Sequence, residues 1–271
     1  MNKMLTFFTA PITALFYPPV YKDAVKSPAS RGVLYCLYLA VLATILTMIF
    51  LSIKVMPEAN AFVKWTQTNM PVLIWTPAGV SLENGKTVAE LTHPKYGQIA
   101  LFDMTKTTAK VADLGTAYVL VTPKKIFIKR NQNQIEERDI TGAGMRRGQQ
   151  PPPRARIDGA ILGKLYENLK KMMVFMGALS LLILSFLLLL IVNLFYSLFG
   201  LLLNLLRNEK IGYGAILNLT CFATSAAFTV TWLRALTPLG TLPLPVVVNI
   251  LINLGFMFFA FKVTDTKKTA V

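Results

Sequence analysis

Residues 172–206 read MMVFMGALSLLILSFLLLLIVNLFYSLFGLLLNLL and contain no charged residue. An α-helix of about 20 residues crosses the ~30 Å hydrocarbon core of a bilayer, so this stretch is too long for one simple crossing. It either crosses once and extends past the membrane surface, or folds back as a hairpin. Each arm of a hairpin would have only about 17 residues, the lower limit for a span. We therefore expect one crossing to about Tyr196, followed by an amphipathic extension where a partner or a site would be found.

The composition of the whole chain agrees with a membrane protein. Of its 271 residues, 54% are hydrophobic and only 15% are charged, whereas soluble domains carry roughly 25% charged residues. We expect an α-helical membrane protein with about four transmembrane helices plus a small extracytoplasmic β-rich (α+β) domain. The four predicted spans cover residues 32–54, 161–206, 213–234 and 246–262.

The chain has a net charge of +15, and we expect a lipid surface and not a nucleic acid as the partner of these basic residues. The basic residues flank the apolar runs, where they would meet anionic headgroups, and no nucleic-acid-binding motif accompanies them. The loop 237–245 has no lysine or arginine, whereas basic residues are frequent in the segment 1–31 and the tail 263–271. By the positive-inside rule we expect both termini in the cytoplasm, with residues 1–31 lying partly at the membrane interface.

Between the first two spans, residues 55–140 have the pattern of a folded domain. Short apolar runs separated by turn signals predict strands in a mainly antiparallel arrangement. Asn84-Gly85 predicts a hairpin turn between the flanking segments. The predicted strands cover residues 71–75, 86–91, 98–102, 117–121 and 125–129.

Residues 141–160 (TGAGMRRGQQPPPRARIDGA) predict a linker, because glycine and proline are dense and apolar residues sparse. This segment is either a solvated tether or a contact with an anionic lipid or polymer. The candidate anionic-surface contacts are Arg146, Arg147, Arg154 and Arg156.

The chain offers little material for catalysis or metal binding. Metal sites need clusters of His, Cys, Asp or Glu, but the chain has a single histidine, His93, and the two cysteines, Cys36 and Cys221, both lie in apolar runs. We expect His93 to be a loop residue and the cysteines to be buried and apolar in character. The prediction is therefore no catalytic residue, no cofactor and no metal.

Uncharged polar residues recur along the predicted spans at helical spacing. Such stripes either hold helices together through hydrogen bonds and close approach, or line a polar cavity for a solute or a lipid headgroup. The candidate polar stripe consists of Asn193, Ser197, Gly200, Asn204, Asn218, Asn249 and Asn253.

Three segments resemble one protein family. They are FYPPVYKDAVKSPASRGVLY before the first span, TPAGVSLENGKTVAELTHPKYGQIALFDMT with the later VLVTPKKIFIK, and the multi-span C-terminal half. Together they resemble an uncharacterised bacterial inner-membrane family, a domain of unknown function distantly similar to the Yip-type four- and five-span proteins. The resemblance implies this topology and a bacterial cytoplasmic-membrane location, and it implies no activity.

The leading functional hypothesis is a non-enzymatic membrane protein that presents its extracytoplasmic domain to an envelope protein or to a second copy of the chain. The alternative is a transporter, channel or lipid-handling subunit that uses the polar stripes. A third hypothesis is an envelope enzyme using Asp103 or His93.

Overall fold

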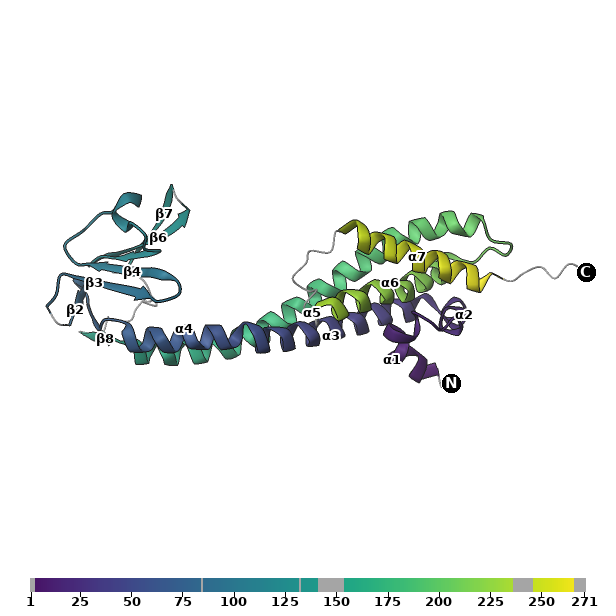
Figure 1. The fold of residues 1–271 in the computed structure, drawn as a ribbon, viewed down its shortest axis with the longest axis horizontal. Coiled ribbons are helices and arrows are strands. Elements are labelled where there is room, and N and C mark those ends of the chain that lie inside the picture. Colours follow the sequence, from purple (N-terminus) through teal and green to yellow (C-terminus); the bar gives the residue numbers. More distant parts are fainter. Residues whose placement is uncertain (1–2, 84, 132, 141–153, 236–245, 266–271) are drawn as a thin grey trace, which may run out of the picture. The chain divides into compact units, whose positions relative to one another are not determined.

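The computed structural model describes residues 3–83, 85–131, 133–140, 154–235 and 246–265 (Figure 1). The chain divides into two compact units. We call Met1–Leu51 with Phe175–Val271 the helical unit, and Ser52–Val174 the β unit. The predicted residues Arg146 and Arg147, the loop 237–245 and most of the tail lie outside the described residues.

Seven α-helices make up most of the described chain. Four of them, α3, α5, α6 and α7, are long and apolar enough to cross a membrane. The helices are α1 (Lys3–Thr13), α2 (Pro19–Val25), α3 (Ala29–Lys54), α4 (Met56–Asn69), α5 (Gly159–Leu205), α6 (Tyr213–Ala235) and α7 (Val246–Thr264).

The uncharged run that opens the sequence forms part of one unbroken helix. Helix α5 has 47 residues, a length of about 70 Å at ~1.5 Å per residue. The prediction of one continuous helix through Gly200 is confirmed, because the helix ends only at Leu205. The helix begins at Gly159, two residues before the predicted start at residue 161. Residues 161–171, which precede the uncharged run, are therefore helical, as the predicted span 161–206 requires.

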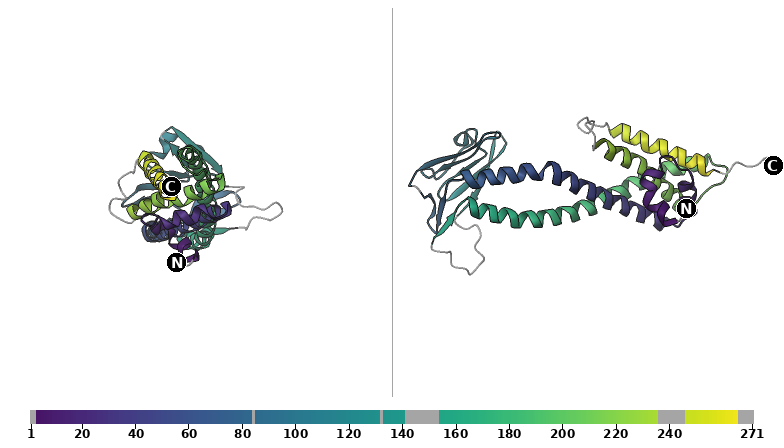
Figure 2. Two further views of the ribbon diagram at one scale, coloured as in Figure 1. Left: turned by 90° about the vertical axis from the view of Figure 1, so that its right-hand side faces the viewer. Right: turned by 60° about the horizontal axis from the view of Figure 1, so that its bottom comes forward.

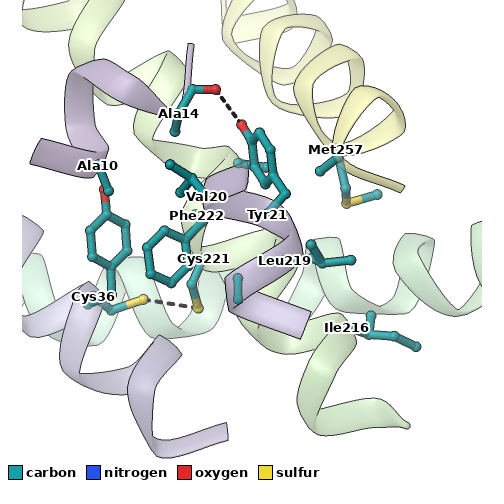
Figure 3. Packing of buried hydrophobic residues seen from close by; sticks show 14 of the residues in the cluster. Ala10, Ala14, Val20, Tyr21, Cys36, Ile216, Leu219, Cys221, Phe222 and Met257 are labelled. Atoms are coloured by element: carbon teal, nitrogen blue, oxygen red, sulfur yellow. Dashed lines mark hydrogen bonds between the residues drawn. The ribbon is translucent and has the colours of Figure 1, made fainter. Parts of the chain in front are cut away.

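In the core of the helical unit, α6 packs against α1 and α2 near the N-terminus and against α7 near the C-terminus. Helices α6 and α7 lie side by side (Figure 1, Figure 2). Tyr35 of α3 stacks on Phe222 of α6 with ring centroids 4.1 Å apart. The sulfur atoms of Cys36 and Cys221 are 3.3 Å apart and fully buried (Figure 3).

The N-terminal segment, which the sequence places partly at the membrane interface, also takes part in the core of the helical unit. Its helices α1 and α2 contribute buried side chains to the core of the helical unit. Tyr21 is fully buried and donates its hydroxyl hydrogen bond to the carbonyl of Ala14, 2.8 Å away (Figure 3). Phe8 and Phe16 remain exposed, so the segment also keeps apolar side chains on its outer surface.

The β unit contains two sheets. The first has the order β2-β1-β8, and the second has the order β3-β4-β5-β6-β7. All described pairings are antiparallel except the parallel pair β4–β5. The strands are β1 (Leu73–Thr76), β2 (Gly79–Leu82), β3 (Val88–His93), β4 (Gly97–Asp103), β5 (Val119–Val121), β6 (Lys125–Asn131), β7 (Gln134–Asp139) and β8 (Ala155–Ile157).

Both faces of the five-stranded sheet are covered. One face packs against the three-stranded sheet through a cluster that includes Leu73, Leu82 and Phe102. The opposite face buries Leu120 and Phe127 with Leu114 of the short 3-10 helix η1 (Val111–Leu114). The alternation of side chains along a strand sends neighbouring residues to these two cores.

Two sequence predictions for this region are wrong, and one helix was not predicted. Residues 56–69 form helix α4. The expected hairpin at Gly85 does not form, because β2 and β3 belong to different sheets. The predicted linker 141–160 ends earlier than expected, since residues 155–157 form β8 and pair with β1.

Helix α4 packs closely on the first turns of α5. An added Cβ at Gly159 would lie 2.0 Å from the carbonyl oxygen of Gln67, and one at Gly163 would lie 1.6 Å from the Gln67 amide nitrogen. Tyr166 also donates its hydroxyl hydrogen bond to the side chain of Asn60 at 2.9 Å. A side chain at Gly159 would meet the backbone of Gln67, so glycine permits the close approach there, whereas a Cβ at Gly163 would displace the flexible Gln67 side chain.

Candidate functional site

The first half of the predicted stripe on α5 is used for packing against α6. Asn193 is fully buried. Its amide donates to the carbonyl of Leu189 at 2.9 Å, and its oxygen accepts the hydroxyl of Thr224 at 2.7 Å. Ser197 donates to its own helix, so the hydroxyl of Tyr213, 2.7 Å away, is the donor in their mutual hydrogen bond. Both polar side chains are thus satisfied inside the helical unit.

The second half of the stripe fixes the turn between α5 and α6. An added Cβ at Gly200 would lie 2.5 Å from a methyl group of Ile216, so glycine allows the two helices to approach. Asn204 binds the backbone of Ile211 twice: its amide donates to the carbonyl at 3.0 Å, and its oxygen accepts the N–H at 3.1 Å. The stripe therefore holds adjacent segments together.

Asn218 of α6 has the most extensive hydrogen bonding among the predicted stripe residues. Its oxygen accepts the backbone N–H of Gly32 at 2.8 Å. Its amide lies 3.1, 2.9 and 3.0 Å from the carbonyl oxygens of Ala24, Ser27 and Pro28. Asn218 thereby binds backbone groups at the end of α2 and at the start of α3.

The stripe on α7 is less completely satisfied. The amide of Asn253 donates to the carbonyl of Asn249 at 3.1 Å and reaches the hydroxyl of Tyr196 at 3.3 Å. The Asn253 side-chain oxygen is buried and has no hydrogen-bond partner among the described residues. The side-chain oxygen of Asn249 accepts a long hydrogen bond of 3.4 Å from Thr231. Among the described stripe residues, Asn253 retains unused hydrogen-bonding capacity.

Arg207, which follows α5, is a buried residue that the sequence did not single out as a candidate. Only 7% of Arg207 is exposed. Its guanidinium donates to the carbonyl of Phe261 at 3.0 Å, and to the hydroxyl and carbonyl of Thr264 at 2.8 and 2.9 Å. These oxygens lie at the C-terminal end of α7, where a cation is favoured by the helix dipole. The sequence contained one signal for this role, because Arg207 directly follows the uncharged run 172–206.

A groove lies beside Arg207, between the ends of α5 and α7. Its volume is about 310 Å³. The walls are mainly apolar, and two cationic residues and one carboxylate line the same groove. The lining residues are Leu203, Leu206, Arg207, Phe258, Phe261, Lys262 and Asp265.

The arginines predicted to contact an anionic surface have separate environments. Arg154 is exposed. Arg156 lies in β8 and pairs with Glu83 at 3.4 Å and Asp158 at 3.7 Å. Its charge is therefore compensated within the β unit, which weakens its candidacy as an anion contact.

His93 is part of a ring cluster formed by α4 and the turn between β3 and β4. Its imidazole centroid lies 4.4 Å from Trp65 and 4.7 Å from Tyr96. The backbone N–H of Lys95 donates to Nδ1 of His93 at 3.0 Å, so the ring carries its hydrogen on Nε2. His93 thus has a packing and turn-forming role in the β unit.

Two carboxylates in the β unit have lowered pKa values because of basic neighbours. The pKa of Asp113 is lowered mainly by the hydrogen bond from Lys106, and further by the backbone N–H of Lys110. The pKa of Glu136 is lowered by Arg138 and then by Arg130. In the described part of the chain, no group of three or more His, Cys, Asp or Glu residues could hold a metal ion.

Comparison with known proteins gives a family and no activity. No curated protein and no solved structure matches the chain. Residues 8–261 match the family described as "Protein of unknown function (DUF1189)". The match spans most of both units. The chain therefore belongs to the DUF1189 family.

Proposed function

We propose that this protein is a non-enzymatic, four-span protein of the bacterial cytoplasmic membrane that binds an extended segment of an envelope protein through its β unit. Both termini are cytoplasmic, and the β unit is extracytoplasmic. The four long apolar helices support the membrane assignment. The basic residues around the termini, together with the uncharged loop 237–245, support the orientation.

One observation carries the binding proposal: among the described residues, strand β3 pairs with β4 on one side and has no neighbouring strand on its other side. The N–H of Met104 donates to the carbonyl of Thr87, so that pair is hydrogen-bonded. Because hydrogen-bonded and non-hydrogen-bonded pairs alternate, the backbone groups of Val88 and Glu90 point away from β4. An extended peptide could pair with these groups and add a strand.

The opposite edge of the same sheet is protected. Four consecutive residues of strand β7, Glu136 to Asp139, are charged, and Glu136 pairs with both Arg130 and Arg138. Glu137 pairs with Lys125. Charged side chains on an edge discourage the addition of a strand. The difference between the two edges favours β3, where Val88 is 45% exposed, as the docking edge.

A matched pair of proline substitutions tests this proposal. Glu90→Pro removes an outward N–H from β3, and proline is tolerated at outward positions of an edge strand. Glu137 occupies the corresponding outward position on β7, because Ile140 donates to Lys124 and the pairs alternate from there. Glu137→Pro is therefore the control for loss of a carboxylate and for a proline on an edge.

The readout is a photo-crosslinking amino acid at Val88 in growing cells. We expect a discrete adduct with an envelope protein that is lost in Glu90→Pro and retained in Glu137→Pro. An absent adduct, or one that persists in Glu90→Pro, refutes the docking edge.

Topology is tested separately with a cysteine at Asn208, an exposed residue between α5 and α6. The native Cys36 and Cys221 are replaced by alanine in this background. Labelling only by a membrane-permeant reagent is expected. Exclusive labelling from outside would overturn the orientation.

The alternative function, a transporter or lipid-handling subunit, is favoured by the unsatisfied oxygen of Asn253. Asn249→Leu combined with Asn253→Leu separates the two functions. If the folded variant keeps the Val88 adduct and its only defect is lower thermal stability, the stripe serves packing. Loss of a solute or lipid phenotype in a folded variant would support the alternative.

A further inference from the structure

We propose that the groove between the ends of α5 and α7 binds an ethanolamine phospholipid, with the phosphate at Arg207 and Lys262, the ammonium at Asp265, and an acyl chain along the apolar wall. The inference rests on the proposed membrane placement, in which this end of the helices faces the cytoplasmic leaflet. Its chemistry comes from three features of the groove.

The first feature is an apolar wall that continues onto the outer surface. Leu206 is 80% exposed and Phe258 is 56% exposed. Leu203 and Phe261 form the inner part of the same wall. The volume of about 310 Å³ is at the lower end of the range for small-molecule sites. An acyl chain that enters the groove from the bilayer would cover these exposed apolar side chains.

The second feature is positive charge without a paired carboxylate. All described hydrogen-bond partners of the buried Arg207 are neutral oxygens. Lys262 is exposed at the rim and has no described ion-pair partner. A buried charge is costly unless it is paired. A phosphate at the mouth of the groove supplies the missing anion through charge-assisted hydrogen bonds.

The third feature is a carboxylate with an unused oxygen. Asp265 lines the groove and is only partly buried. Its Oδ2 accepts the backbone N–H of Asn208 at 3.4 Å and the side-chain amide of Asn208 at 3.2 Å. Its Oδ1 is withdrawn from solvent and has no hydrogen-bond partner among the described residues. Such an oxygen requires a donor.

These features together select the headgroup. Inorganic phosphate would satisfy the cations and would leave the carboxylate and the apolar wall unused. A choline headgroup has the same charges as ethanolamine and no N–H to donate. A glycerol headgroup offers only neutral hydroxyls, which make weaker hydrogen bonds to a carboxylate than an ammonium does. Ethanolamine supplies both the anion and a charged donor.

The test is native mass spectrometry of the full-length protein in mild detergent, titrated with lipids of identical acyl chains. We expect phosphatidylethanolamine to bind about tenfold more tightly than phosphatidylcholine, because one charge-assisted hydrogen bond separates them. Asp265→Asn keeps an acceptor for Asn208 and should make the two lipids equal. Lys262→Gln should weaken every phospholipid. Lys54→Gln, at the end of α3 in the β unit, is the charge control and should change nothing.

Several results overturn the proposal. Equal binding of the two zwitterionic lipids by the parent protein removes the role of the ammonium. A preference for ethanolamine that survives Asp265→Asn removes the role of the carboxylate. Tighter binding of phosphatidylglycerol, or complete displacement of lipid by millimolar inorganic phosphate, would indicate a general anion site.

The lipid and the envelope partner are tested independently. Glu90→Pro lies on β3 and should leave the lipid preference unchanged. Asp265→Asn should leave the Val88 photo-adduct unchanged. If the parent protein shows the Val88 adduct and no ethanolamine preference, the lipid proposal fails. If it shows the preference and no adduct, the docking proposal fails.

Discussion

Asn218→Leu should release the contact between α6 and the turn that joins α2 to α3. Leucine has a similar size and removes every hydrogen bond of the amide. The asparagine oxygen holds one backbone N–H, and its two amide hydrogens serve three nearby carbonyls. About three hydrogen bonds are therefore lost, each contributing about 1 kcal/mol. We expect local opening to become easier by about 3 kcal/mol, or about 100-fold.

The two native cysteines report this opening. Cys36 and Cys221 are both fully buried, and they follow Gly32 and Asn218 within about one helical turn. Labelling by a maleimide in mild detergent, followed by mass spectrometry, should be about 100-fold faster in Asn218→Leu. The control is Asn249→Leu, which removes a weaker contact and should change the rate about twofold. If Asn218→Leu labels at the rate of this control, the assignment of Asn218 as a clamp is wrong.

Two further predictions concern the β unit. Gly159→Ala should lower the thermal midpoint of the full-length protein because its Cβ would meet the Gln67 carbonyl, whereas Gly177→Ala, with open space around it, should not. Lys106→Met should lower stability at neutral pH, with a loss that disappears on acidification. The pKa of Asp113 is lowered in the folded state, so its contribution is present above its unfolded value of about 4 and is lost as the pH falls through the folded value. Tryptophan fluorescence between about pH 7 and about pH 2 measures this convergence, and a difference that persists at low pH would contradict the assignment.

The helices were predictable because hydrophobic length is a local property of the sequence. The run 172–206 forms part of a single helix, as its spacing of polar residues indicated. That spacing also placed Asn193 and Asn204 on one buried side, and both make contacts within the helical unit. Their partners were not predictable, since Thr224 and Ile211 belong to segments whose packing depends on the whole unit.

The β unit shows where local patterns fail. Strand β8 has three residues and pairs with β1, although 78 residues of sequence lie between Thr76 at the end of β1 and Ala155 at the start of β8. Helix α4 had usable signals, with proline in its first turn and Glu58 nearby. They were missed because its surroundings read as strands. The turn at Gly85 has the positive φ of a hairpin, yet it joins strands of different sheets.

The contact between Arg207 and the end of α7 also bears on the order of biosynthesis. The guanidinium is synthesised 54 residues before the carbonyl of Phe261 that it binds. Until α7 emerges, a nascent chain carries an arginine whose acceptors do not yet exist. The hydrogen bonds that satisfy the buried guanidinium can therefore form only after α7 has been synthesised and has packed beside the end of α5.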